Sequence, residues 1–308
     1  MFGKKGNKTL GILFAVLLVV AVLLYFTDIG KKERTFKDVL VDIDTASVTQ
    51  ILIYPKSQNH QEIKVYKENN EWKLPLPNGK IARVPTEKVT NLFTQLLSIK
   101  PKRLAGRGIS KWGEFQVDST GTEVKVIEDG ATTLDIILGK MSFQQPRTVN
   151  TFVRLAKDND VYEVDGFLDM TFNQDSKVLR DGTIINSDYN TWQTISFSYP
   201  ADTSFQISHV DNKWLLNGMK ADSVKTVNSL RALSKLSNTD FIDDIGEDDL
   251  LLSPTYKLTI ETQTSQTIEV EAFVDSARTI IKTSQNPDTY FDGKNILKRI
   301  FLSQKKFM

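Results

Sequence analysis

The chain of 308 residues contains no cysteine and only two histidines, His60 and His209. The absence of cysteine excludes disulfides, thiol catalysis, thiolate metal sites and lipoprotein acylation. A histidine-based zinc site or a serine–histidine–aspartate triad would need one of the two histidines, and neither has a second histidine nearby at ligand spacing. The sequence therefore predicts no catalytic residue, no metal site and no cofactor.

An excess of charge of either sign is also missing. The chain has 39 basic and 38 acidic residues and a formal net charge of +1, which does not favour nucleic acid as a partner. Gly139-Lys140 is not preceded by the glycine spacing of a phosphate-binding loop, and Met141 stands where such a loop has serine or threonine. We therefore expect no nucleotide site.

One long hydrophobic run is present, from Leu10 to Phe26, and it contains no charged residue. As a helix it would be roughly 25 Å long, which is close to the thickness of a hydrocarbon core of about 30 Å. The residues that follow, Phe26-Thr27-Asp28, are poorly suited to cleavage of a signal peptide. The pattern predicts an uncleaved transmembrane helix at 9–27 after a short tail at 1–8.

The orientation of this helix is less strongly determined by charge. Three lysines precede it, and two lysines and an arginine follow it, so the count of basic residues is equal on the two sides. The N-terminal amine adds one more positive charge on the N-terminal side of the helix. We expect the tail to lie in the cytoplasm and the larger C-terminal part to be translocated.

The remaining sequence repeats itself at long range. Asn70-Glu71-Trp72 and Asn212-Lys213-Trp214 each follow an alternating apolar stretch, which predicts a β-hairpin with its tryptophan on the buried face. A pair of alternating strands comes later in each copy, with one constant offset between the copies. Their apolar positions are Val124, Val126, Leu134 and Ile136 in the first copy, and Leu258, Ile260, Ile268 and Val270 in the second.

A helix lies between these hairpins in each copy. The first has an apolar stripe at helical spacing, and Pro85-Thr86 suits its first turn; in the second, Asp222-Ser223 offers caps. The stripes consist of Val89, Leu92, Phe93, Leu96 and Leu97, and of Val227, Leu230, Leu233 and Leu236. We predict an α+β fold with two tandem homologous units, at 28–174 and 175–308, each an antiparallel sheet with a packed helix.

The segments after the two helices differ in charge. In the first copy no acid lies between Lys100 and Lys111, and in the second no base lies between Asp240 and Asp249. Drift on two solvated loops would explain this. The sharper hypothesis is that they pair, between the halves or head-to-tail in an oligomer, because complementary charge fixes register. The candidate interaction residues are Lys100, Lys102, Arg103, Arg107, Lys111, Asp240, Asp243, Asp244, Glu247, Asp248 and Asp249.

The layout resembles a bacterial family of single-span proteins whose domain has no known function. The features that carry the resemblance are the N-terminal anchor, the two blocks of tryptophan followed by a leucine-rich helix, and the segment Leu179-Arg180-Asp181-Gly182-Thr183-Ile184-Ile185. The resemblance implies genes beside the permease and auxiliary subunits of gliding-motility-type ABC transporters. It also implies an inner-membrane protein whose large part is periplasmic, and it implies no reaction.

The leading hypothesis is therefore a non-enzymatic accessory subunit that contacts the bilayer, a permease and auxiliary ectodomain subunits. The alternative is a tethered binding module for a polysaccharide, peptidoglycan or peptide. That alternative predicts an exposed aromatic cleft, most simply between the copies, with Trp112, Trp192 or Tyr189 in it. A hydrolase with paired carboxylates has no residue pattern in its favour.

Overall fold

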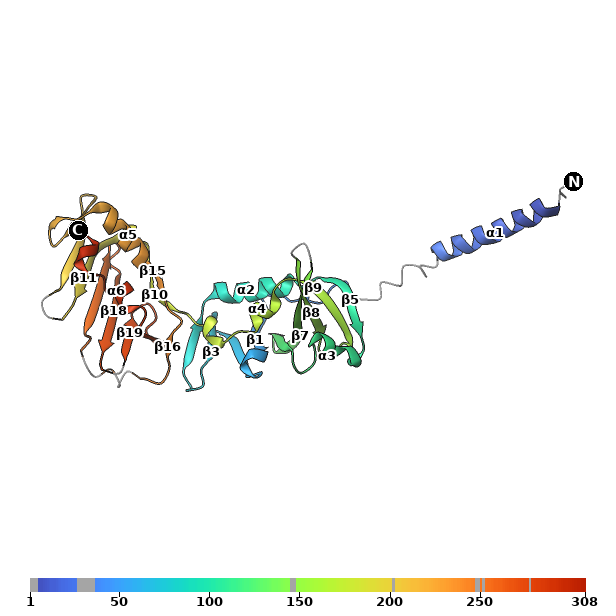
Figure 1. Ribbon diagram of the computed structural model, residues 1–308, viewed down its shortest axis with the longest axis horizontal. Coiled ribbons are helices and arrows are strands. Elements are labelled where there is room, and N and C mark those ends of the chain that lie inside the picture. Colours follow the sequence, from blue (N-terminus) through green and yellow to red (C-terminus); the bar gives the residue numbers. More distant parts are fainter. Residues whose placement is uncertain are drawn as a thin grey trace.

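Two nine-stranded antiparallel sheets with the same strand order form the body of the protein (Figure 1). The computed structural model describes residues 5–26, 37–144, 148–200, 203–246, 250, 253–276 and 278–308. The first sheet has the order β4-β3-β2-β1-β6-β7-β8-β9-β5, and the second has the order β14-β13-β12-β11-β17-β18-β19-β20-β16. Each sheet and its helices are called a unit below.

In the first unit, helix α2 (Thr86–Leu97) connects β4 to β5, and the short helices α3 (Trp112–Phe115) and α4 (Leu168–Phe172) follow β5 and β9. The strands are β1 Val48–Tyr54, β2 Ile63–Glu68, β3 Glu71–Pro75, β4 Ile81–Val84, β5 Pro101–Arg107, β6 Thr122–Glu128, β7 Ala131–Gln144, β8 Thr148–Leu155 and β9 Asp160–Asp165.

In the second unit, α5 (Ser223–Leu233) and α6 (Leu297–Ile300) take the places of α2 and α4. The strands are β11 Trp192–Ser198, β12 Phe205–Val210, β13 Lys213–Leu216, β14 Met219–Lys220, β16 Phe241–Ile242, β17 Tyr256–Thr262, β18 Thr267–Val274, β19 Thr279–Thr283 and β20 Tyr290–Asp292. A separate two-stranded sheet pairs β10 (Thr183–Asn186) with β15 (Lys235–Ser237).

The alternating pattern positions the strands as expected. Val124 and Val126 pair with Ile136 and Leu134, and Leu258 and Ile260 pair with Val270 and Ile268. All eight side chains are buried. Trp72 and Trp214, with 6% and 7% of their surface exposed, lie on the buried faces of their hairpins as predicted. The fold class of large antiparallel sheets with a few helices is thus confirmed.

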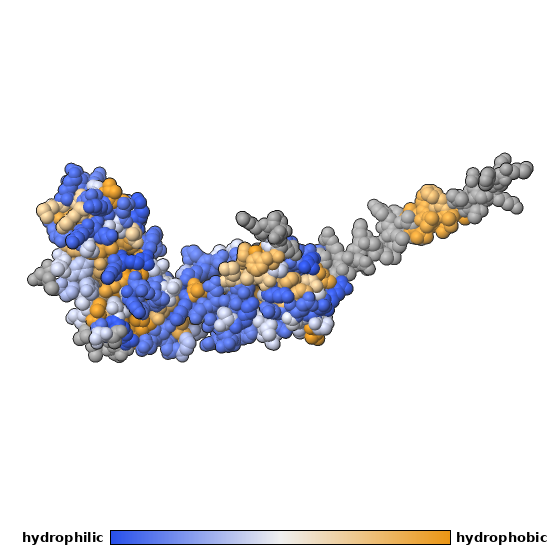
Figure 2. Space-filling model, in the orientation of Figure 1, coloured by the Kyte–Doolittle hydropathy of each residue, from blue (hydrophilic) through white to orange (hydrophobic). Residues whose placement is uncertain are grey.

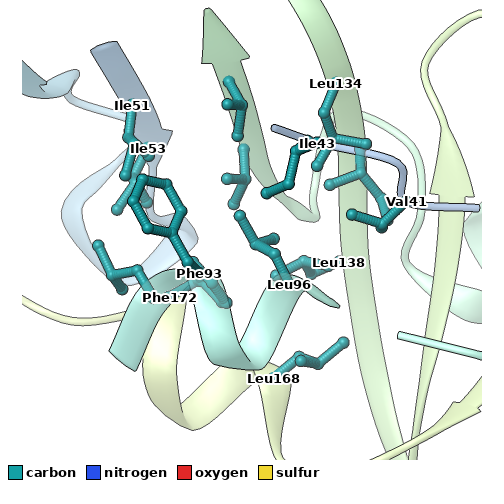
Figure 3. Close-up of a cluster of buried hydrophobic side chains, with 14 of the residues drawn as sticks. Val41, Ile43, Ile51, Ile53, Phe93, Leu96, Leu134, Leu138, Leu168 and Phe172 are labelled. Atoms are coloured by element: carbon teal, nitrogen blue, oxygen red, sulfur yellow. The ribbon is translucent and has the colours of Figure 1, made fainter. Parts of the chain in front are cut away.

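Helix α2 packs on the sheet through part of its predicted stripe. Figure 3 shows Phe93 and Leu96 facing Ile51 and Leu138 of the strands. Leu97 does not follow the prediction, because 45% of its surface is exposed at the last residue of the helix. In the second unit Asp222 caps α5 by accepting a hydrogen bond from the Lys225 amide, at 2.9 Å.

Leu236 is a second departure from the helical prediction. It is buried, but it belongs to β15 rather than to α5. The helix ends at Leu233, and the chain then pairs with β10. An apolar residue three positions after a helical stripe cannot by itself distinguish one more turn of helix from the first buried position of a strand.

The basic segment after α2 is also not the predicted loop. Pro101–Arg107 forms β5, which pairs with β9 and has two register shifts. Proline, glycine and charge oppose strand structure in the interior of a sheet, but they are tolerated at an edge. Since β5 is the last strand in the sheet order, its composition fits its position.

The hydrophobic run lies in helix α1 (Lys5–Phe26), which includes both Leu10 and Phe26. Among the residues that the structure describes, no helix meets the length and hydropathy required to span a membrane. The membrane span at 9–27 is therefore not confirmed and stays a prediction.

Two neighbouring leucines in α2 provide a test of the packing. Leu96 is fully buried, whereas Leu97 is largely exposed. We expect L96A to lower the free energy of unfolding by about 2–5 kcal/mol through a cavity and lost transfer energy. L97A should change it by about 0.5 kcal/mol or less. Denaturant unfolding of the full-length protein in detergent measures both, and equal losses would contradict this packing.

Candidate functional site at the joint of the two units

The polypeptide passes from one hydrophobic core to the other over a few residues. Leu179 packs in the core of the first unit, and Ile184 packs in the core of the second. This change lies a few residues after the boundary that the sequence predicts between the units, at 174/175. The residues between Leu179 and the start of β10, Arg180–Gly182, are called the joining segment below.

Arg180 contacts both units. Its carbonyl oxygen accepts a hydrogen bond from Lys88 Nζ of α2, at 2.6 Å. Its guanidinium donates two parallel hydrogen bonds of 2.8 Å to the carboxylate of Asp243 in the second unit. The guanidinium also stacks on Phe241, 3.8 Å from the ring centroid. Only 4% of the Arg180 side chain is exposed. The contacts replace the hydration of its two terminal nitrogens, whereas its buried Nε has no hydrogen-bond partner among the described residues.

Asp181 also contacts both units, but its side chain binds the first unit and its carbonyl binds the second. Its carboxylate forms an ion pair with Arg83 of β4, and its amide donates to the Arg83 carbonyl at 2.9 Å. Its own carbonyl accepts from Asn286 Nδ2 of the second unit, at 2.8 Å. Together, the contacts of Arg180 and Asp181 form a staple that fixes the backbone of the joining segment to both units.

A turn of the first unit contacts the segment after α5 that contains Asp240, Asp243 and Asp244, which is called the acidic segment below. Asn78 Nδ2, in the β3–β4 turn, donates to the Asp243 carbonyl at 2.5 Å. Lys80 Nζ donates to the Ile245 carbonyl and lies 5.5 Å from the centroid of the Tyr290 ring. These contacts add a second connection at the joint, separate from the chain itself.

A cavity of about 400 Å³ lies beside the staple. Its walls come from the β1–β2 loop, β3, the residues after α4 and the acidic segment. The charged residues of the lining are Glu62, Lys64, Asp175, Lys177, Arg180 and Asp243. The mixture of signs does not select a ligand. Among the described residues, no cluster of three or more histidines or acids could hold a metal ion.

The pKa of Asp181 is shifted by competing effects. Burial raises it, but the hydrogen bonds from Thr183 and Arg83, together with the positive charge of Arg83, outweigh the burial and lower the pKa below its ordinary value of 3.8. Burial lowers the pKa of Lys88, against the opposing effect of Asp181. The charged form of Asp181 is thus the form that the folded joint stabilises.

The predicted basic residues lie at the other end of the first sheet. Figure 1 shows β5 at the edge away from the second unit. Lys102, Arg103 and Lys111 form ion pairs within the first unit, with Asp165, Glu163 and Glu114 respectively. Lys100 is exposed, and Arg107 ends β5.

The predicted acidic residues that the structure describes lie at or near the joint. Asp243 pairs with Arg180, and Asp244 lies 3.3 Å from Arg278. Asp240 is exposed and accepts a backbone hydrogen bond from Asp292. The structure thus connects the acidic segment with the joining segment and the β3–β4 turn rather than with β5. Glu247, Asp248 and Asp249 lie outside the described residues.

Aromatic residues proposed for a binding cleft are mostly engaged elsewhere. Trp192 is fully buried in the second core, so it cannot be a stacking platform. The guanidinium of Arg154 covers Trp112 at 3.7 Å from the ring centroid. Tyr189 packs against the second core.

Sequence reasoning did not identify the staple. A signal was present, because Arg180-Asp181 is a charged pair between apolar Leu179 and the apolar pair Ile184-Ile185. Charged residues enclosed by core positions are rarely buried unless they are paired. Their partners, however, lie 92 and 98 residues before them and 63 and 105 residues after them. No local pattern reveals pairings at such separations.

Comparison with protein families gives one match, to the Domain of unknown function (DUF4340), over residues 76–259. The chain belongs to this family. The matched range begins just before Asn78, includes every residue of the staple except Asn286, and ends in β17. The comparisons with curated proteins and with solved structures gave no match.

Breaking the ion pair of the staple should destabilise the protein. D243N leaves the buried Arg180 guanidinium without its counter-charge, which costs about 3–5 kcal/mol in fully buried pairs. Because the Asp243 side chain is 34% exposed, we expect a loss of about 1–3 kcal/mol in unfolding free energy. The control R278Q breaks the exposed pair with Asp244 and should cost about 0–1 kcal/mol. Comparable losses in the two variants would contradict a special role for Arg180.

The lowered pKa of Asp181 predicts a dependence of stability on pH. A carboxylate with a depressed folded-state pKa contributes stability above its unfolded value, and this contribution is lost as pH falls through the folded value. We expect D181N to lower Tm at neutral pH and to reduce the loss of Tm that the wild-type protein suffers below about pH 4. Parallel Tm curves for the two proteins down to low pH would show that Asp181 does not titrate with folding.

Proposed function

We propose that this DUF4340 protein is a non-enzymatic, membrane-anchored scaffold subunit of an ABC-transporter-type complex, of the gliding-motility-like kind. Its N-terminal helix lies in the bacterial inner membrane with the tail in the cytoplasm, and its two tandem units are periplasmic. Its partners are a permease and auxiliary ectodomain subunits. The uncharged run from Leu10 to Phe26 supports the anchor.

The observation that carries the proposal is the staple at the joint. A flexible linker would let two domains move independently. Here the joining segment is bonded to both units, and the β3–β4 turn adds direct contacts. A chain that fixes two similar units at one spacing can present two surfaces to larger partners at a constant separation, which is the task of a scaffold.

Ten residues, 27–36, separate helix α1 from Lys37. Fully extended, such a segment reaches about 35 Å. Lys37 is then held to the first unit by an ion pair of 3.0 Å with Asp158. The short connection supports a subunit that works close to the bilayer rather than one that searches a large volume.

Affinity purification of the tagged full-length protein in mild detergent tests the proposal. We expect mass spectrometry to find a permease, its ATPase and a second ectodomain subunit with the wild-type protein. D243N should retain less of these partners than R278Q, because only the former loosens the joint.

Recovery of the protein alone, under conditions that preserve other membrane complexes, would contradict the scaffold proposal. That result would favour the tethered binding module. Equal recovery of partners with D243N and R278Q would leave the assembly intact but remove the fixed joint as its basis.

A further inference from the structure

Three large apolar side chains project from one end of the first unit. Phe143, Phe167 and Met170 have 74%, 50% and 59% of their surface exposed. Phe143 pairs across the β7–β8 hairpin with Val149, whose carbonyl accepts a hydrogen bond from the amide of Gly166, next to Phe167. Met170 lies one helical turn after Phe167 in α4. These three residues are called the apolar tip below, and Figure 2 shows apolar side chains gathered on the first unit.

The second unit provides an internal comparison at α4. The equivalent helix is α6, and its buried Ile296 and Ile300 match the buried Leu168 and Phe172 at one constant offset. At the same offset Met170 corresponds to Lys298, and Phe167 corresponds to Asn295, both exposed. The shared fold therefore does not require apolar residues at these places.

Phe143 lies on a part of the hairpin that the second unit lacks. Strand β7 has 14 residues and β8 has 8, whereas β18 and β19 have 8 and 5. The extension carries an exposed phenylalanine beyond the edge of the core. Large apolar side chains that are exposed together in a soluble domain mark a contact surface.

The position of the tip favours lipid as the occupant. The first unit is the one joined to α1, by ten residues that reach about 35 Å at most. Strand β8 ends near Asp158, where Lys37 is bound, and begins near the tip, which puts about 26 Å between the two ends of an eight-residue strand. Lys37 and the tip thus lie at opposite ends of β8, and the distance between them is shorter than the reach of the ten residues before Lys37, so the tip can touch a bilayer that holds α1.

The chemistry of the tip also suits an interface with lipid. Its apolar groups come from a hairpin extension and the start of a helix, and so protrude from the unit. The exposed Lys100, and Lys102 in its ion pair with Asp165, lie on the neighbouring strand edge. Protruding aromatic and apolar side chains beside lysines are typical of segments that enter the headgroup region of a membrane.

We propose that the apolar tip inserts into the outer surface of the bilayer in which helix α1 is anchored, so that the first unit lies on the membrane. This inference rests on the proposed anchor. It assigns a lipid-contacting role to Phe143, Phe167 and Met170.

The absence of cysteine allows a direct test. Full-length M170C and F143C are each labelled with an environment-sensitive fluorophore and reconstituted into vesicles containing lipids with a nitroxide at a shallow acyl position. K298C, the matched position in the second unit, is the control. We expect at least twofold quenching at positions 143 and 170, and none beyond the vesicle background at 298.

The outcomes separate the inference from the proposed function. If the protein floats with vesicles but quenching at 170 equals that at 298, the lipid contact is wrong and the anchor stands. If the protein does not float with vesicles, the anchor and the inference both fail. A fluorophore at 170 that is shielded from water only when partner subunits are present, without quenching by lipid, would assign the tip to a protein interface and overturn the proposal.

Discussion

The arrangement of the two units depends on the ion pair between the buried Arg180 side chain and the partly exposed Asp243. The Arg180 guanidinium lies between Asp243 and the ring of Phe241, with almost none of its surface exposed. Removing a cation from water is costly unless geometry and hydrogen bonding replace the hydration. The parallel hydrogen bonds to Asp243 and the stacking on Phe241 replace part of that hydration, and they form only when the acidic segment lies against the joining segment. The ion pair thus specifies one orientation of the two units relative to each other. Its main effect is on that specificity rather than on the free energy of unfolding.

Asp181, the neighbouring residue, restricts the orientation of the two units further. The Arg180 side chain binds the second unit, and its carbonyl accepts a hydrogen bond from the first. The Asp181 side chain binds the first unit, and its carbonyl accepts a hydrogen bond from the second. A rotation of one unit would therefore break a side-chain contact and a main-chain contact together. These bonds make the joint cooperative, because a change in one backbone angle of the joining segment would break bonds to both units at once. For a subunit proposed to hold large partners at fixed separation, this rigidity is the relevant property.

Much of the fold could be predicted from period-2 alternation. The tryptophan hairpins and the paired strands around Val126 and Ile260 emerged because one face of each is buried and the other is solvated. Edge strands do not obey that rule. Strand β5 was missed because proline, glycine and charge dominate it, and the position of Leu97 was misjudged because a helical stripe does not reveal where the core ends. Of the candidate interaction residues that the structure describes, Asp243 contacts the joining segment, and its partner Arg180 could not be assigned from local sequence.

Glu163 carries a further consequence of the repeated strand order. Because the two sheets have the same strand order, the segment after α2 and the segment after α5 could each pair with the edge of the wrong sheet during folding. Glu163 is 2% exposed and forms an ion pair with Arg103 of β5. At the offset that matches Leu168 with Ile296, Glu163 corresponds to Phe291, whose register partner is Phe241 of the other segment. Exchanging the segments would put the Phe241 ring opposite buried Glu163 and remove Arg103, the counter-charge of that carboxylate, which is unfavourable. Arg103 of the first segment and Phe241 of the second thus help to keep each edge strand in its own sheet.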